Sequence, residues 1–285
     1  MSEWAAWLGR EEVREDRIGT AAVTRWCATL DRPTAADGTV PQGYHWCLGL
    51  PDAETGDLGE DGHPRRDPSS SSFLPPVPLP RRMWASSKVE FLHPLRIGET
   101  VKRCSRVKAI TPKQGGSGPL VFLEVEHDTI TEDRIAVREV QSIVYREATP
   151  EGTPAAPPPP GPELKELDGW SATRTLIPSE PLLFRFSALT FNSHRIHYDL
   201  PYATAEEGYR GLVVHGPLIA TLLLDLARRA FGEQPLSRFS FRAMSPAICG
   251  EALHLALREG EAGLELAALA SDGRQVMAAT ATRQS

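Results

Sequence analysis

A proline-rich run near the middle of the chain most limits how this protein can fold. Residues 149–162 read TPEGTPAAPPPPGP. Proline lacks a backbone N–H and has a fixed φ, so such a run continues neither a helix nor a central strand. We therefore interpret residues 150–162 as a semi-rigid linker between two domains, residues 1–149 and 163–285. A length of 285 residues suits two domains.

The first domain has helix-like apolar spacing at residues 4–8 and 17–30, and residues 39–50 read as the start of a longer helix. A stretch rich in Gly, Ser and Pro follows at residues 51–80, which predicts a long loop that is either disordered or a lid. The strand-like runs come after it, at residues 83–91, 100–111, 120–131 and 135–147.

The second domain repeats this order of helices followed by an antiparallel meander. A strand-like run at 173–177 and a helical stretch from Leu182 precede an apolar helix at 217–231. The later strand-like runs cover residues 236–244, 252–258, 263–271 and 275–282. The repeated order predicts an α+β fold with two antiparallel sheets joined edge to edge, each wrapped around a central helix.

Charge and cysteine content limit the possible binding partners and the cellular location of the protein. The formal net charge is −6, whereas nucleic-acid binding needs a concentrated basic excess, so we expect no nucleic-acid partner. The pairs Arg65–Arg66 and Arg81–Arg82 could still meet a small phosphorylated ligand. The four cysteines lack C-x-x-C spacing, and neither a signal peptide nor a membrane span is apparent, so we expect a cytoplasmic protein without a membrane partner.

The densest polar cluster is SALTFNSHRIHYD at residues 187–199, which contains Asn192, His194 and His197. His194 and His197 form an H-x-x-H pair, to which His215 would add a third ligand, so a metal site is one interpretation. No carboxylate or cysteine stands at standard zincin spacing, and we therefore expect no metal. Histidine, whose pKa is close to neutrality, instead suits acid–base chemistry.

This cluster resembles the motif of the MaoC-like and R-specific enoyl hydratases, in which a catalytic acid stands five positions before a catalytic histidine. The pattern T-x-N-x-H-x-I-H-Y-D is similar to the two-hot-dog branch, which includes mitochondrial-type 3-hydroxyacyl thioester dehydratases and the mesaconyl-, 3-methylfumaryl- and itaconyl-CoA hydratases. The resemblance implies a double hot-dog fold with one active site, in the second domain. His197 matches the catalytic histidine, whereas Asn192 stands where the broader family has aspartate.

Hydration of an α,β-unsaturated thioester requires a base for water, an acid for the α-carbon and donors for the enolate oxygen. An amide cannot take up a proton, so we expect His197 to be the single acid–base group, with Asn192 and His194 orienting the water. The turn GLVVHGP at 211–217 leads into the apolar helix, whose free N–H groups suit an oxyanion. The resemblance assigns that contact to Gly216, with the N–H of His215 or a neighbour as a second donor.

Substrate contacts are predicted from residues near the motif. Arginine suits CoA phosphates or a substrate carboxylate, which makes Arg195, Arg185 and Arg242 candidates, together with Tyr198. The resemblance favours a short branched dicarboxylyl-CoA substrate, no cofactor beyond the CoA carried by the substrate, and a homodimer. A straight-chain 3-hydroxyacyl thioester dehydratase and a non-catalytic acyl-CoA or polyketide-intermediate binding protein remain the alternatives.

Overall fold

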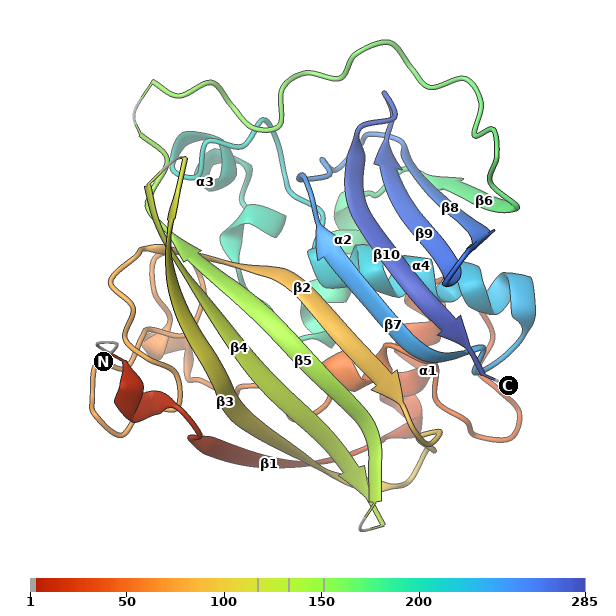
Figure 1. The fold of residues 1–285 in the computed structure, drawn as a ribbon, viewed down its shortest axis with the longest axis horizontal. Helices are drawn as coiled ribbons and strands as arrows, with labels where there is room; N and C mark the ends of the chain where they lie inside the picture. The colour runs from red at the N-terminus through yellow and green to blue at the C-terminus, as the bar shows by residue number, and fades with distance from the viewer. Residues whose placement is uncertain (1–3, 117, 133, 151, 285) are drawn as a thin grey trace.

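The computed structural model describes residues 4–116, 118–132, 134–150 and 152–284. In this part of the chain, every strand belongs to one ten-stranded antiparallel sheet (Figure 1). The first half of the chain provides β1 (Glu11–Arg17), β3 (Thr100–Gly115), β4 (Gly118–Thr131), β5 (Arg134–Arg146) and β2 (Arg81–Phe91), in that spatial order. The second half continues with β7 (Leu236–Ala243), β10 (Gln275–Arg283), β9 (Gly263–Ala270), β8 (Leu253–Gly260) and β6 (Ala172–Leu176).

Strands β2 and β7 join the two halves. They pair in antiparallel register from Ser86 opposite Arg242 to Glu90 opposite Arg238. Each half thereby removes one exposed edge of the other, which leaves β1 and β6 at the ends of the sheet. The predicted edge-to-edge junction is confirmed.

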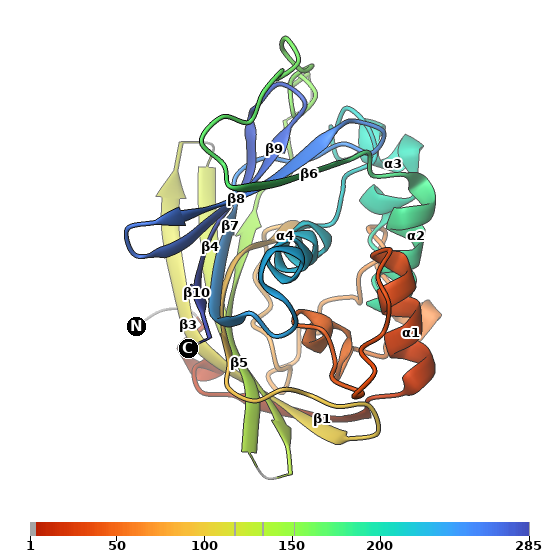
Figure 2. The same ribbon diagram turned by 90° about the vertical axis from the view of Figure 1, so that its right-hand side faces the viewer.

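Helix α4 (Gly216–Phe231) forms the centre of the molecule. Its residues from Leu218 to Ala227 are all buried, as expected for a helix enclosed on several sides. Figure 2 shows α4 between the curled sheet and an outer layer that contains α1 (Thr20–Thr29), α2 (Glu180–Leu189) and α3 (Leu200–Ala205). The double hot-dog prediction is confirmed by this arrangement.

The first half differs from the second at its predicted central helix. Residues 39–50 contain only a one-turn 3-10 helix, Tyr44–Cys47, so the prediction of a longer helix there is wrong. Gly43 precedes it with a φ of 95°, and a Cβ at this position would lie 3.0 Å from Cδ1 of Leu224 in α4. This turn packs closely against α4, and residues of both halves of the sheet share one core with that helix.

The amino-terminal elements also differ from the sequence prediction. Residues 4–8 form a 3-10 turn (Ala5–Trp7), and the helix predicted over 17–30 is confirmed from Thr20 to Thr29. Strand β1 was not predicted, because its sequence EEVREDR is almost entirely charged. That composition suits an edge strand exposed to water.

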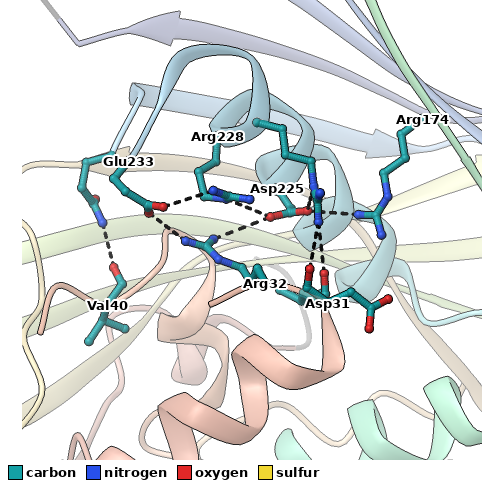
Figure 3. Close-up of polar contacts among 10 residues, drawn as sticks. Asp31, Arg32, Val40, Arg174, Asp225, Arg228 and Glu233 are labelled. Atoms are coloured by element: carbon teal, nitrogen blue, oxygen red, sulfur yellow. Dashed lines mark hydrogen bonds and ion pairs between the residues drawn. The ribbon is translucent and has the colours of Figure 1, made fainter. Parts of the chain in front are cut away.

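A buried carboxylate links α4 to the first half. Asp225 has a fully buried side chain that forms ion pairs with Arg174, Arg228 and Arg229 at 3.0, 3.1 and 2.6 Å (Figure 3). Arg32, which follows α1, lies 3.7 Å away and also pairs with Glu233. Asp225 thus pairs with its helical neighbours Arg228 and Arg229, and the network is structural. Within the described residues, no helix is long and apolar enough to cross a membrane.

Candidate active site

The motif segment lies where α2 ends and the chain turns toward α4. Phe191 takes a φ of 46°, and the Asn192 side-chain oxygen then accepts a hydrogen bond from the N–H of His194 at 3.0 Å. A 3-10 turn, Arg195–His197, follows directly. The carboxylate of Asp199 caps α3 by accepting the N–H of Tyr202. These local bonds turn the histidines of the motif toward the interior.

His197 is buried, with an exposed fraction of 7%, and its tautomer follows from its partner. Nδ1 lies 2.7 Å from the carbonyl oxygen of Val213, so Nδ1 carries the hydrogen and Nε2 is left with its lone pair. Burial lowers the pKa of His197 to about 4, against a weaker opposing effect of the Val213 hydrogen bond. The imidazole is therefore neutral at pH 7 and can accept a proton at Nε2.

The ring of His215 packs against the ring of His197. Its ring stacks on that of His197 with centroids 3.5 Å apart, and its Nε2 lies 2.8 Å from Ser187 Oγ. The side chain is fully buried and is not among the residues that line the cavities described below. The ring thus packs against the catalytic candidate, and the assignment of its N–H as an oxyanion donor stays a prediction.

Gly216 opens α4 and lines a cavity together with His197 and His194. No atom lies within 4 Å of the position that a Cβ would take on Gly216, so there is open space in front of this helix terminus. N–H groups in the first turn of a helix have no intrahelical acceptor and carry partial positive charge. A thioester oxygen can approach the backbone here, and the predicted position of Gly216 fits that role.

Two adjoining cavities meet at this site. The first, of about 910 Å³, lies between α2, strands β3 to β5 and the loop of residues 51–80. The second, of about 1340 Å³, contains His194, His197 and Gly216. The residues common to both linings are His63, Pro64, Arg65, Arg66, Arg82, Gln141 and Asn192. Asn192 therefore stands at the boundary between the two spaces.

The loop of residues 51–80 packs directly on the motif. The N–H of Arg195 donates to the carbonyl of Asp61 at 2.9 Å, the Arg195 guanidinium donates to the carbonyl of Glu60 at 2.9 Å, and Ser193 Oγ donates to the carbonyl of Gly62 at 2.5 Å. Gly62 has a φ of 84°, and a Cβ on it would lie 2.0 Å from the Ser193 carbonyl oxygen. The loop is ordered against the site in this structure.

This docking brings in two residues that the sequence analysis missed, Asp61 and His63. Asp61 Oδ2 lies 2.8 Å from His63 Nδ1, and the His63 ring lies 4.1 Å from that of His194. Burial acts to raise the pKa of Asp61, but the hydrogen bonds from the His63 ring and backbone N–H outweigh it, so the pKa lies below its usual range and the carboxyl is ionised. The sequence signal that could have identified these two residues is the spacing Asp-Gly-His within a glycine-bounded turn.

Asp61, His63 and His194 are also the one group in the described part of the chain with metal-binding potential. One ligand atom from each residue lies within 4.8 Å of the others. The ring of His197 is 5.5 Å from that of His194, nearly perpendicular to it. The trio suggested by the sequence, His194, His197 and His215, is therefore not the group that converges.

Two of the predicted arginines do not reach the site. Arg185 follows Phe184 on the exposed side of α2, while Leu183 and Phe186 point inward, and Arg242 alternates with buried Phe241 on β7. Both are exposed and absent from the linings of these two cavities, which do not support the predicted contact with substrate. Helix phase and strand alternation turn them outward.

Arg195 and Tyr198 do line cavities. Arg195 lies in the second cavity, but its guanidinium is bound to Asp199 at 2.6 Å and stacks over Tyr202, so it organises the motif. Tyr198 lines the first cavity and is 52% exposed.

Other arginines face the cavities. Arg82 lines both of them and forms no ion pair with any described carboxylate, and Arg103 in the first cavity likewise has none. Arg66 donates to the carbonyls of Val77, Leu79 and Pro80 and thus closes the loop. Arg81 binds Glu207 and fixes the end of α3. Of the two arginine pairs noted in the sequence, Arg82 and Arg65 line both cavities without a carboxylate partner among the described residues, and the Arg65 guanidinium donates to the carbonyl of Leu58.

Comparison with known proteins shows which family this chain resembles. The family model for hydroxyacyl-thioester dehydratase type 2 matches residues 43–249. The chain is 44% identical over 282 residues to the mesaconyl-C(4)-CoA hydratase of Chloroflexus aurantiacus, covering 98% of this chain and 97% of that protein.

Solved structures show the same fold at low identity. A MaoC-like dehydratase from Phytophthora capsici superimposes with a TM-score of 0.73 at 14% identity, covering 100% of this chain and 98% of that one. A Mycobacterium tuberculosis protein with a double hot-dog fold superimposes with a TM-score of 0.58 at 15% identity, covering 97% and 96%.

Proposed function

Because the chain belongs to the hydroxyacyl-thioester dehydratase type 2 family, within the MaoC-like two-hot-dog hydratases, we propose that it is a hydro-lyase acting on acyl-CoA. It adds water reversibly across the double bond of an α,β-unsaturated CoA thioester. One observation carries this proposal: buried His197, with an unprotonated Nε2, and the unobstructed amino terminus of α4 at Gly216 line the same cavity.

The geometry supports the following steps. Nε2 of His197 accepts a proton from water as the water oxygen bonds to the β-carbon, and the double-bond electrons move to the thioester oxygen. The first-turn N–H groups of α4 at Gly216 stabilise that oxygen. A positioned acid–base group contributes about 10²–10⁴ in rate and an oxyanion donor about 10²–10³. Asn192 and His194 border the same space and orient the water.

For the acyl group we propose a short branched dicarboxylyl ester of the mesaconyl, 3-methylfumaryl or itaconyl kind. The identity to the mesaconyl-C(4)-CoA hydratase supports this class. Arg82 supports it independently, because a guanidinium on both cavities without a carboxylate partner in the described protein suits a free substrate carboxylate. A cytoplasmic location belongs to the same proposal and is supported by four cysteines that are all free thiols.

The test follows loss of enoyl-thioester absorbance for mesaconyl-, itaconyl- and crotonyl-CoA. We expect the native protein to hydrate the dicarboxylyl esters and His197→Ala to lose about 10²–10⁴ in kcat while still binding the ester. Arg82→Met should raise KM for the dicarboxylyl esters and leave crotonyl-CoA unaffected, whereas the exposed Arg242→Met serves as the matched control.

The same panel decides between the alternatives. Preferred turnover of crotonyl-CoA would favour a straight-chain 3-hydroxyacyl thioester dehydratase, the activity that the family description names. Binding of esters without turnover of any of them would favour an acyl-CoA or polyketide-intermediate binding protein and would contradict the assignment of His197.

A further inference from the structure

In the proposed hydration, no residue named so far stabilises the imidazolium that forms when His197 takes up a proton. The reaction moves a proton from water to the α-carbon, and during that transfer an imidazolium exists in the site. The contacts of His197 are the Val213 carbonyl and the rings of His194 and His215, with no carboxylate among the described residues. Asn192 remains uncharged and accepts no proton. A buried imidazolium at position 197 therefore lacks a counter-charge.

The loop of residues 51–80 provides that charge. Asp61 is ionised, so its carboxylate accepts a hydrogen bond from Nδ1–H of His63 at 2.8 Å and also from the His63 backbone N–H at 3.0 Å. These bonds fix the His63 tautomer and leave Nε2 with its lone pair. A carboxylate that orients a histidine in this way also stabilises the imidazolium form, as in hydrolase triads. His63 lines both cavities.

We propose that His63 is a second acid–base residue of this site and that Asp61, acting through His63, is the carboxylate that the motif lacks at position 192. The inference rests on the proposed hydratase function. It makes the first half of the chain a contributor of reacting groups, although the hydratase motif lies entirely in the second half.

The ring arrangement gives the proton a path. His194 contacts both other rings, with centroids 4.1 Å from His63 and 5.5 Å from His197. In hydration, an O–H bond of water breaks and its proton goes to His197 Nε2 as the oxygen–β-carbon bond forms. The proton passes by way of His194 to His63, whose cation Asp61 stabilises. His63 then donates it to the α-carbon as the enolate electron pair forms the new C–H bond, and every histidine is neutral again.

The electrostatic surroundings agree with a neutral resting state. Burial lowers the pKa of His63, the hydrogen bond from Nδ1 to Asp61 opposes this, and the cations Arg82 and Arg66 lower it further. Burial lowers the pKa of His194 as well, and the neighbouring rings add to the effect, while Asp61 opposes it. All three histidines thus begin as proton acceptors, and Asp61 is the carboxylate that favours the charged forms of His63 and His194.

The experiment compares His63→Ala, His63→Gln and Asp61→Asn with the native chain on the esters that the native chain hydrates. The exposed residues His93 and Asp57, which line neither cavity, provide the matched controls His93→Ala and Asp57→Asn. We expect the His63 variants to lose about 10²–10⁴ in kcat, with ester affinity and melting temperature close to native. Asn at position 61 keeps an acceptor for the backbone N–H of His63 but removes the charge. Asp61→Asn should therefore lower kcat and move the acidic limb of the kcat/KM profile to lower pH.

The outcomes separate the two proposals. Native-like kcat in both His63 variants would overturn this inference and leave the hydratase function intact, whereas the absence of hydration by the native chain would overturn both. Loss of native activity on treatment with a chelator, with recovery on addition of Zn²⁺, would make Asp61, His63 and His194 a metal site and would also refute the acid–base assignment.

Discussion

Gly62→Ala tests whether docking of the loop holds the site together, because it adds a single methyl group at the contact between loop and motif. That methyl carbon would lie 2.0 Å from the Ser193 carbonyl oxygen and 2.9 Å from its carbon, at a backbone φ of 84°. Non-bonded contacts of a Cβ below about 3 Å are essentially never observed, so the two segments must separate by about 1 Å. A left-handed φ costs alanine a further ~1–2 kcal/mol.

The expected effect on catalysis follows from that displacement. Asp61 and His63 flank Gly62, and a misplacement of about 1 Å in a reacting group costs about 10² in rate. Stability should change less, because the loss is confined to the strain and to the hydrogen bonds from Ser193 and Arg195, each worth about 1 kcal/mol. We therefore expect kcat to fall about 10²-fold with a decrease of roughly 2–4 kcal/mol in the free energy of unfolding.

Steady-state hydration kinetics and urea unfolding measure the two effects. Gly56→Ala, in the same loop with no atom within 4 Å of the new Cβ, is the control and should behave like the native chain. In a His63→Ala background, Gly62→Ala should cost little more activity, since both changes disable the same residue. Native kcat for Gly62→Ala, or full additivity in the double variant, would refute the reasoning.

Two further predictions concern stability. Burial lowers the pKa values of His197, His127 and His215 below the unfolded value of 6.5, so the unfolded chain binds more protons on acidification. Stability should be complete above pH 6.5 and fall as pH decreases toward about 4, with His197 alone contributing about 3 kcal/mol. A melting temperature that does not change between pH 7 and 4.5 would contradict this. Asp225→Asn leaves Arg32 and its neighbours without their buried partner and should cost about 3–5 kcal/mol in urea unfolding, whereas Glu233→Gln, at a half-exposed partner of the same Arg32, should cost far less.

The fold could be predicted where periodicity persists over a whole element. The apolar stretch that became α4 and the alternating run that became β7 carry their burial pattern in the sequence. Residues 39–50 have helix-like apolar spacing too, but Gly43 and Gly49 take positive φ values there and the turn packs against α4. Tertiary packing determined the conformation of that segment, and the local sequence pattern did not indicate this packing.

The residues of the site likewise divide into those that local sequence could predict and those that it could not. Asn192, His194 and His197 are neighbours in sequence, and Gly216 begins the next long helix, so their proximity followed from local structure. The outward directions of Arg185 and Arg242 were also encoded locally, beside buried Phe186 and Phe241, and closer attention to phase would have predicted that both are exposed.

Asp61 and His63 could not be located in this way. Their loop lacks periodicity, and its contact with the motif spans a separation of 131 residues between Ser193 and Gly62. The loss of a carboxylate from a linear motif therefore says little about whether the folded site contains one. In this double hot dog, strands β2 and β7 join the first half to the second half, which carries the motif. A carboxylate that is absent at position 192 can therefore be provided by a loop of the first half. If Asp61→Asn shifts the acidic limb as expected, the first half does more than complete the sheet, and a search for catalytic residues in such proteins must include the loops of the half that lacks the motif.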